Sequence, residues 1–222
     1  MQSAGRGRRG RGWESPAGIN IYYTLMLKPD FSSDCAPMLT LVMALAVAKG
    51  IRQTLRRDSE EAAAKVGIKW PNDIVVDGKK VCGILTEMSM EQGYIQHIVI
   101  GVGINVRKQE FPEEIRDRAA AIDEQCGFRI SRSQLIADIM EAFEEDYEIF
   151  LRTHDLKGLR ASYAELLVNQ DREVCVLDPK GEYRGIARGI NDQGELLVER
   201  QDGTVEEVYA GEVSVRGIYG YV

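Results

Sequence analysis

Four short runs of β-forming residues follow one another between residues 66 and 106, separated only by turns. The first run ends at Pro71, and the residue before a proline is restricted to extended geometry. The second run leads into Asp77-Gly78, which is a strong signal for a two-residue hairpin. Runs spaced this closely form a meander, so we predict a largely antiparallel sheet. They cover residues 66–70, 74–76, 80–89 and 94–106, with the last turn at 91–93.

Patterns typical of helices surround this meander. Residues 37–55 are almost entirely apolar in their first half, which predicts a central core helix. The apolar run is well short of the ~20 residues that span a bilayer. Residues 131–153 repeat apolar residues every three or four positions, which predicts an amphipathic helix capped by Ser131 or Ser133. We also expect a helix at 155–167, a half-buried strand at 19–27, and either a loop or a frayed helical turn at 56–65.

The pattern changes after Asn169, where short β runs alternate with turns. Five such runs within about 50 residues predict a small β-barrel. The predicted fold class is therefore α+β: a mixed, largely antiparallel sheet packed with helices, followed by a small barrel. We place the first domain at residues 1–170 and the second at 171–222. The C-terminal runs cover residues 173–177, 183–190, 195–199, 204–209 and 213–216.

The cysteines and histidines exclude several kinds of site. Cys35, Cys82, Cys126 and Cys175 show neither a C-x-x-C pair nor metal-ligand spacing. This favours free thiols in a reducing, cytoplasmic compartment. His97 and His154 are isolated, which predicts structural roles for them, no metal held by protein side chains and no Ser-His-Asp triad.

The first strongly charged segment is Gly5-Arg6-Gly7-Arg8-Arg9-Gly10-Arg11-Gly12, followed by Trp13. Glycine lets the backbone approach a ligand closely, and arginine matches phosphate geometry with its planar fork. The segment is therefore typical of a cationic loop that binds an anion. The rest of the chain carries 24 basic against 35 acidic residues, a balance of −11. This acidic balance argues against broad nucleic-acid binding.

Two further motifs lie at strand ends or within strands. Lys69-Trp70-Pro71-Asn72-Asp73 ends a strand in a position where rigid scaffolds place functional groups, although a simple Asn-Asp turn would look the same. Lys80-Val81-Cys82-Gly83 and Gly101-Val102-Gly103-Ile104-Asn105 put three glycines on neighbouring strands. Glycines there indicate close approach of a ligand or another backbone, or else bulges and tight packing. No dinucleotide-binding fingerprint is present, because a strand surrounds Gly101-x-Gly103.

In this order and spacing, and with the closing barrel, these motifs resemble the catalytic domain of the biotin protein ligases across nearly the whole chain. The resemblance implies a class II synthetase-like fold followed by an SH3-like barrel. It also implies a reaction that joins biotin to ATP, giving biotinyl-5′-AMP and pyrophosphate. The biotinyl group then passes to one lysine of the biotin carboxyl carrier domain of a carboxylase such as acetyl-CoA carboxylase. Mg²⁺ is expected to bind through the ATP phosphates.

The resemblance also assigns roles to individual residues. Catalytic positions, where cations neutralise developing phosphate charge, are Arg8, Lys69 and Lys80. Biotin-binding positions are Gln2, Gly5, Arg6, Gly7, Arg8, Lys80 and Gly83. Positions that contact ATP or the adenylate are Arg8, Arg11, Trp13, Lys69, Asn72, Asp73 and Asn105. From the residues alone, Trp13 is also compatible with a core position. Asp73 either orients the acceptor lysine or only forms the turn.

The sequence departs from the family pattern at its start. Only four residues precede Gly5, so the family's Ser-Thr-Asn segment and its N-terminal helix-turn-helix are missing. The expectation is a truncated chain, and the alternative is an enzyme that has lost part of its pocket. No DNA binding and no membrane association are expected from this chain, and a homodimer is possible. Rival interpretations are an inactive remnant, a lipoate-type ligase, or a phosphate- or RNA-binding protein that uses the Gly-Arg segment.

Overall fold

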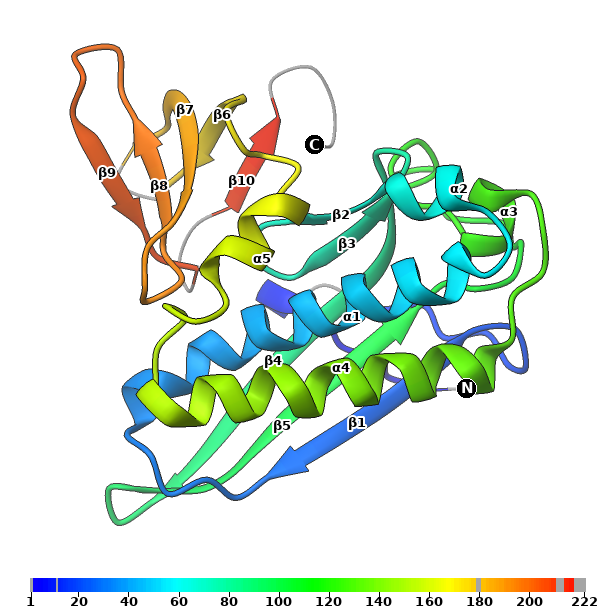
Figure 1. Ribbon diagram of the computed structural model, residues 1–222, viewed down its shortest axis with the longest axis horizontal. Coiled ribbons are helices and arrows are strands. Elements are labelled where there is room, and N and C mark those ends of the chain that lie inside the picture. The colour runs from blue at the N-terminus through cyan, green and yellow to red at the C-terminus, as the bar shows by residue number, and fades with distance from the viewer. Residues whose placement is uncertain (1, 11, 179–180, 211–213, 218–222) are drawn as a thin grey trace.

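The computed structural model describes residues 2–10, 12–178, 181–210 and 214–217. Its first sheet pairs neighbouring strands antiparallel in the order β1-β5-β4-β3-β2, which confirms the predicted meander (Figure 1). Asp77 and Gly78 both have positive φ, 50° and 74°, as a two-residue hairpin turn requires. The strands are β1 (Ile21–Leu27), β2 (Val66–Lys69), β3 (Asp73–Val76), β4 (Lys79–Glu91) and β5 (Tyr94–Ile104).

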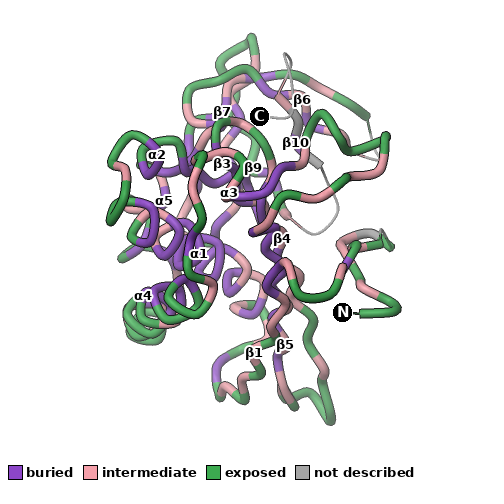
Figure 2. The backbone as a smooth tube through the Cα atoms, turned by 90° about the vertical axis from the view of Figure 1, so that its right-hand side faces the viewer, coloured by how far each residue is buried: buried purple, intermediate pink, exposed green. Residues whose placement is uncertain are grey.

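Two long helices, α1 (Leu39–Arg56) and α4 (Arg132–Thr153), cover one face of this sheet. Figure 2 shows both helices on one side of β4 and β5 and the N-terminal segment on the other. The 3₁₀ turn η2 (Ser33–Met38) leads into α1. The Ser131 side chain accepts a hydrogen bond from the Gln134 backbone N–H, which confirms the predicted cap of α4. The opposite face of the sheet is thereby left to the N-terminal segment.

The segment Ser33–Arg56 is long and apolar enough to cross a membrane by length and composition alone. In the folded protein, however, 72% of its most apolar window is buried. Val42, Met43 and Leu45 are fully buried in the core between the sheet and α4. A helix that is apolar on most sides and buried within the protein is a core helix, as the sequence predicts.

The helix predicted at 155–167 is wrong in its first part. Helix α5 (Arg160–Leu166) begins five residues later, because the preceding segment is held in turns by other contacts. The backbone N–H of Leu156 donates to the Asp192 carbonyl in the C-terminal sheet, and Gly158 lies close against Ile149. Residues 56–65, which the sequence leaves open between a loop and a helical turn, contain α2 (Glu60–Ala64). The remaining short helices are η1 (Arg8–Gly10) and α3 (Ile122–Cys126).

The C-terminal part is a second five-stranded antiparallel sheet, in the order β10-β6-β7-β8-β9. Its last strand pairs with its first and forms one edge of the sheet, and the predicted small antiparallel β domain is confirmed. The boundary at residue 170 stays a prediction, three residues before the first strand. The strands are β6 (Glu173–Leu177), β7 (Tyr183–Ile190), β8 (Leu196–Glu199), β9 (Val205–Val208) and β10 (Ser214–Gly217).

Candidate active site

One residue from each strand of the first sheet forms a single row across it. In order, the cross-strand neighbours are Lys69, Asp73, Gly83, Gly103 and Tyr22. All five line one cavity of about 1100 Å³. Because side chains alternate between the two faces of a sheet, the adjacent row faces the helices instead. That row consists of Ile68, Ile74, Cys82, Ile104 and Ile21, each at most 5% exposed.

Lys80 reaches this cavity because β4 carries a bulge. Ile74 pairs with Cys82 but Val75 pairs with Lys80, so Val81 is an extra residue in β4. A bulge re-aims the side chains beside it, and here it brings Lys80 to the same face as Gly83. The Lys80 Nζ lies 2.6 Å from Asp73 Oδ1. The two motifs that carry Lys80 and Asp73 thus meet in one ion pair at the cavity.

The indole of Trp13 lies over the paired glycines of the row. A Cβ added to Gly103 would lie 2.5 Å from the Trp13 ring, and one added to Gly83 would lie 2.8 Å from it. Such distances exclude a side chain at either position unless the ring moves. The Lys80 Nζ is 5.6 Å from the centroid of the same ring. Trp13 therefore forms a wall of the cavity, and its role in contacting the adenylate stays a prediction.

The Gly-Arg segment is closed into a loop by backbone contacts. The Trp13 N–H donates to the Gly5 carbonyl at 3.0 Å, and Arg6 forms an antiparallel bridge with Gly12. A Cβ on Gly5 would lie 2.2 Å from the Trp13 carbonyl oxygen, so glycine is required there. At the start of the loop, Gln2 Oε1 accepts a hydrogen bond from the Ser15 hydroxyl at 3.1 Å.

Arg8 connects this loop to two distant segments. Its Nη1 donates to Asn72 Oδ1 at 2.9 Å, and its Nη2 donates to the carbonyl of Ala210, in the turn that follows β9. Asn72 is itself fixed, since its Nδ2 donates to the Ile84 carbonyl at 2.9 Å. Arg6 differs from Arg8: its side chain is 79% exposed and lies 3.9 Å from Glu87. Arg8 is therefore the arginine of the loop that the described contacts hold at the cavity.

Asn105 closes the far end of β5. It is 5% exposed, and its backbone N–H donates to the carbonyl of the bulged Val81 at 2.8 Å. The segment 118–120 runs beside Lys80, whose N–H donates to the Arg118 carbonyl at 2.7 Å. Asn105 and Lys80 are therefore held by the same network of backbone bonds.

Eleven of the thirteen predicted site residues line the cavity. Gly5 does not line it and acts through the backbone contact with Trp13. Arg11 lies outside the described residues. The residues that line the cavity are Gln2, Arg6, Gly7, Arg8, Trp13, Lys69, Asn72, Asp73, Lys80, Gly83 and Asn105.

Sequence reasoning missed several other residues of the cavity wall. The alternation along 19–27 could have placed Tyr22 on the open face, opposite the buried Ile21. Burial raises the pKa of the Tyr22 hydroxyl, so it is neutral at pH 7. The segment 107–119 gave no pattern that points to a site. Further missed residues are Thr24, Phe111, Ile115, Arg118 and Val215.

Metal binding by the protein alone finds no support in the described part of the chain. Within it, no group of three or more His, Cys, Asp or Glu side chains converges. The carboxylate at the floor of the cavity, Asp73, is 2.6 Å from the Lys80 ammonium. The four cysteines are free, and burial raises the pKa of Cys82, which keeps this thiol protonated.

Two family models match the chain. The biotin/lipoate A/B protein ligase family matches residues 1–105, and the biotin protein ligase C-terminal domain matches residues 171–216. The first match covers the Gly-Arg loop and the first sheet, and the second match covers the C-terminal sheet. The segment between them contains α3, α4 and α5.

Characterised relatives extend over nearly the whole chain. The bifunctional ligase/repressor BirA of Bacillus spizizenii is 37% identical over 96% of this chain, which spans 64% of the length of that relative. The biotin--[acetyl-CoA-carboxylase] ligase of Mycobacterium tuberculosis is 31% identical over 96% of this chain and 75% of its own length. The corresponding ligase of Paracoccus denitrificans is 30% identical over 95% of this chain and 88% of its own length.

A solved structure shares the fold. The biotin protein ligase of Aquifex aeolicus, in complex with biotin and ATP, superposes with a TM-score of 0.80 at 28% identity. The superposition covers 97% of this chain and 86% of that protein. Sequence and fold therefore agree from the Gly-Arg loop to the C-terminal sheet, and the chain belongs to the biotin protein ligase family.

Proposed function

We propose that this chain activates biotin with ATP and transfers the biotinyl group to a lysine of a biotin carboxyl carrier domain. The observation that carries the proposal is the meeting of Lys80 and Asp73 beside the Gly83–Gly103 pair, under Trp13. The Trp13 indole covers this glycine pair and presents a flat ring beside a fixed cation, which suits a small ring system whose tail ends in a carboxylate. The relatives from M. tuberculosis and P. denitrificans carry the name of this activity.

Adenylation requires cations rather than a strong base, because the biotin carboxylate is already ionised. A carboxylate oxygen attacks the α-phosphorus of ATP, the bond to the β-phosphate breaks, and pyrophosphate leaves. Lys80 is suited to bridge the carboxylate and the α-phosphate, since Asp73 holds its ammonium in place at 2.6 Å. Preorganised charge of this kind is usually the largest single contributor to transition-state stabilisation in such reactions.

The phosphates would lie between the Gly-Arg loop and the 69–73 turn. Arg8, fixed against Asn72, and Lys69, at one end of the floor row, are the cations on this side. The adenosine would lie toward Asn105, where Phe111 and Ile115 offer apolar surface. Mg²⁺ would be held by phosphate oxygens and water, because the described residues offer no cluster of carboxylates for it. Its charge would offset that of the leaving pyrophosphate.

In the second step, the acceptor lysine must attack as a neutral amine. Its nitrogen forms a bond to the acyl carbon, AMP leaves, and one proton is released. Asp73 is the carboxylate at the floor of the cavity, and we assign it the role of orienting this amine. The acceptor is a carrier domain of a carboxylase. We place the reaction in the cytoplasm, where free thiols such as the four cysteines persist.

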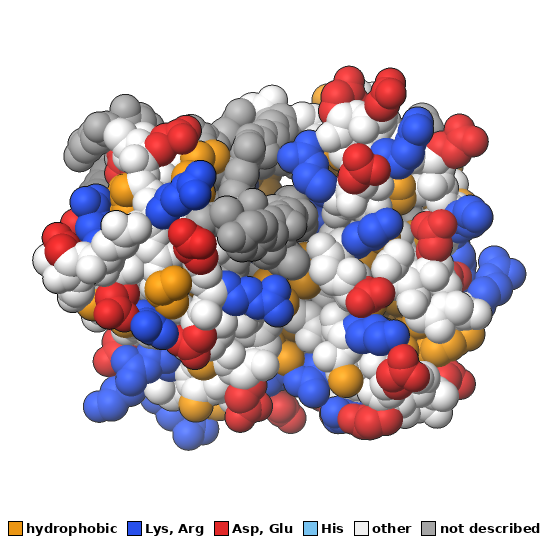
Figure 3. All heavy atoms as spheres, turned by 90° about the horizontal axis from the view of Figure 1, so that it is seen from above, with side chains coloured by type: hydrophobic (Ala, Val, Ile, Leu, Met, Phe, Trp, Pro, Cys, Tyr) orange, Lys and Arg blue, Asp and Glu red, His pale blue; other side chains and the backbone are white. Residues whose placement is uncertain are grey.

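An RNA-binding role for the Gly-Arg loop has less support. Arg8 faces Asn72 and Ala210 rather than open surface. On the described part of the face seen in Figure 3, Lys and Arg side chains are interspersed with Asp and Glu, without a broad basic field. Nucleic-acid binding requires such a field.

The decisive experiment is pyrophosphate release by the purified chain with ATP and Mg²⁺, with biotin or lipoate as the acyl substrate. We expect release with biotin, and labelling of an added carrier domain. Release with lipoate in preference to biotin would indicate the lipoate-type alternative. Release with neither acid would overturn the proposal, and salt-sensitive RNA binding in its place would support the rival role. Sedimentation of the same preparation tests whether the chain forms a homodimer.

A further inference from the structure

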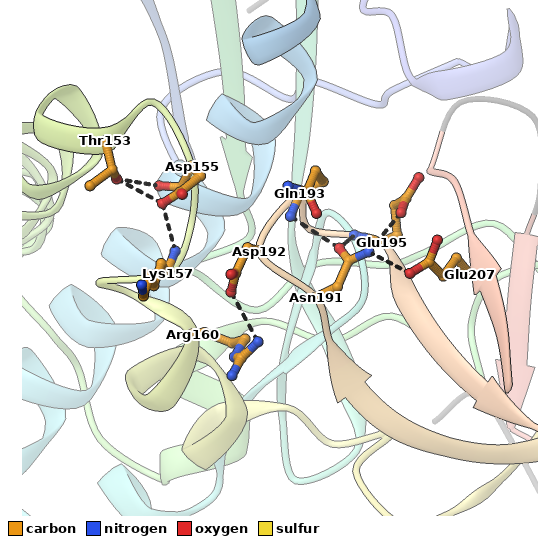
Figure 4. Close-up of polar contacts among 9 residues, drawn as sticks. All are labelled: Thr153, Asp155, Lys157, Arg160, Asn191, Asp192, Gln193, Glu195 and Glu207. Carbon is orange, nitrogen blue, oxygen red and sulfur yellow. Dashed lines mark hydrogen bonds and ion pairs between the residues drawn. The ribbon is translucent and has the colours of Figure 1, made fainter.

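The turn between β7 and β8 is held by several hydrogen bonds of one side chain. We call residues 191–194 the docking turn. Asn191 Oδ1 accepts hydrogen bonds from the backbone N–H groups of Gln193 at 3.1 Å and Glu195 at 2.9 Å, and its Nδ2 donates to Glu195 Oε2 at 2.7 Å (Figure 4). Gly194 ends the turn with φ +80°, a conformation that favours glycine. The side chain of Asn191 thus holds the turn in a single shape.

This turn binds to the first domain through backbone and side-chain contacts. The Asp192 carbonyl accepts a hydrogen bond from the Leu156 N–H at 2.8 Å. Figure 4 shows the side-chain contact, in which Asp192 Oδ1 lies 2.9 Å from Arg160 Nη1. Gly194 packs so closely that an added Cβ would lie 2.9 Å from the side chains of both Leu41 and Leu156. The docking turn is therefore seated against α1 and the segment before α5.

The same turn holds the indole of Trp70. Trp70 is 2% exposed, and its Nε1 donates to the Gly194 carbonyl at 3.0 Å. Its backbone N–H donates to Asn169 Oδ1 at 3.2 Å, and Asn169 is 1% exposed in the connection to the C-terminal sheet. Both ends of Trp70 are therefore fixed by residues outside the first sheet.

Trp70 lies between two residues of the proposed phosphate side. Lys69 precedes it directly, and Asn72, the partner of Arg8, follows two residues later. Arg8 itself donates to the carbonyl of Ala210, in the turn that follows β9 of the same sheet. Two independent contacts thus run from the C-terminal sheet to this side of the cavity. Gly83, Gly103 and Gln2, in contrast, contact residues of the first domain.

We propose that the docking turn is a positioning element for ATP, acting through Trp70 as a positioning residue. The Gly194 carbonyl fixes the indole, the indole fixes the backbone from Lys69 to Asn72, and this backbone sets the cations that receive the phosphates. The inference rests on the proposed function and adds to it that different parts of the chain position ATP and biotin. The C-terminal sheet governs the ATP side of the site and leaves the biotin side to the first domain.

Two glycines of the C-terminal sheet offer a matched test. Gly194 and Gly203 lie in turns of that sheet with φ +80° and +83°, so alanine strains the backbone equally at both. A Cβ at Gly203 meets nothing within 4 Å, whereas one at Gly194 pushes against Leu41 and Leu156. We expect Gly194→Ala to raise the KM for ATP about tenfold and to leave the KM for biotin within about twofold. Gly203→Ala should match the wild type.

Trp70→Phe provides the second variant, because it removes the Nε1 donor and keeps an aromatic ring. It should reproduce the rise in the KM for ATP, and it carries the test if Gly194→Ala does not fold. Hydrogen–deuterium exchange of the peptide covering residues 69–73 gives a readout that does not depend on turnover. Exchange there should be faster in Gly194→Ala and Trp70→Phe than in the wild type or Gly203→Ala.

Each outcome decides the inference. A selective rise in the KM for ATP with faster exchange at 69–73 supports it. Equal loss of ATP and biotin affinity, unchanged kinetics in Trp70→Phe, or equal effects of the two glycine variants would overturn it. If the wild type forms no adenylate, the proposed function fails, and the exchange data alone still decide whether the turn positions this segment.

Discussion

Gly83 faces Gly103 across strands β4 and β5, and the Trp13 indole lies over both. The pair gives the cavity a floor without side chains, bounded by Lys80 on one side. Gly101 lies on the same strand and face as Gly103, yet a Cβ there would meet only the Leu85 carbonyl at 3.7 Å, an ordinary contact. The two glycines of the Gly-Val-Gly motif therefore have different reasons for being glycine.

The first prediction follows from this difference. Gly103→Ala places a methyl group 2.5 Å from the rigid indole, so Trp13 must move into the space proposed for biotin. We expect the KM for biotin to rise about tenfold or more, as for one extra methyl group in a tight pocket. Gly101→Ala should have a much smaller effect. The measurement is a biotin titration of pyrophosphate release, and equal effects of the two substitutions would contradict this account of the floor.

The second prediction concerns the charge of Lys80. Lys80→Gln keeps a long polar side chain but removes the cation beside Asp73, so kcat for pyrophosphate release should fall about 100-fold or more. Lys79→Gln is the matched control, because Lys79 is the exposed neighbour at the start of β4. A similar loss in both variants would show that the effect is not specific to the cavity. Single-turnover measurement of adenylate formation separates this step from transfer.

The third prediction concerns retention of the adenylate by Arg8. Arg8→Gly removes the contacts with Asn72 and Ala210 that hold the loop over the cavity. Biotinyl-5′-AMP should then escape and label lysines of an unrelated bystander protein. Arg6→Gly should leak far less, because the Arg6 side chain is 79% exposed. Streptavidin detection of the bystander measures the leak, and labelling confined to the carrier domain would refute the role given to Arg8.

Local patterns could predict the elements but not the long-range contacts among them. The Asp77-Gly78 hairpin, the strand end at Lys69 and the cap at Ser131 depend on neighbouring residues, and each is present as predicted. The contact between Arg8 and Ala210 joins residues 202 positions apart, and that between Trp70 and Gly194 joins residues 124 apart. No local periodicity encodes such pairs.

In the candidate site too, the residues could be predicted but the contacts among them could not. The family resemblance supplied the residues, but their arrangement depends on strand register, which one bulged residue changes. Without the bulge, Lys80 would lie three positions from Gly83 in a regular strand and would point to the opposite face, toward the helices. The helix predicted from Asp155 begins only at Arg160 for a related reason. The segment before Arg160 is held by the docking turn and does not continue the helix. Contacts formed only in the folded chain decided both cases.

The fourth prediction concerns stability and uses Asp138 of α4, which is 2% exposed and faces α1. Burial acts to raise the pKa of Asp138, but hydrogen bonds from Arg57, Thr54 and Gln134 together outweigh it and hold the pKa below its ordinary value. A carboxylate with a lowered pKa stabilises the fold above the ordinary value of 3.8 and loses this contribution as the pH falls below it. Asp138→Asn should therefore reduce the free energy of unfolding at pH 7 by about 2 kcal/mol.

The pH dependence of stability provides the sharper test of the contact between Asp138 and Arg57. The difference in unfolding free energy between the wild type and Asp138→Asn should shrink as the pH falls below 3.8, where the wild-type carboxylate also becomes protonated. Glu144→Gln is the control, because Glu144 lies on the exposed face of the same helix and surface charges contribute little. Urea unfolding of the three proteins across this pH range gives the measurement. A difference that stays constant with pH would mean that packing, rather than the charge of Asp138, joins α4 to α1.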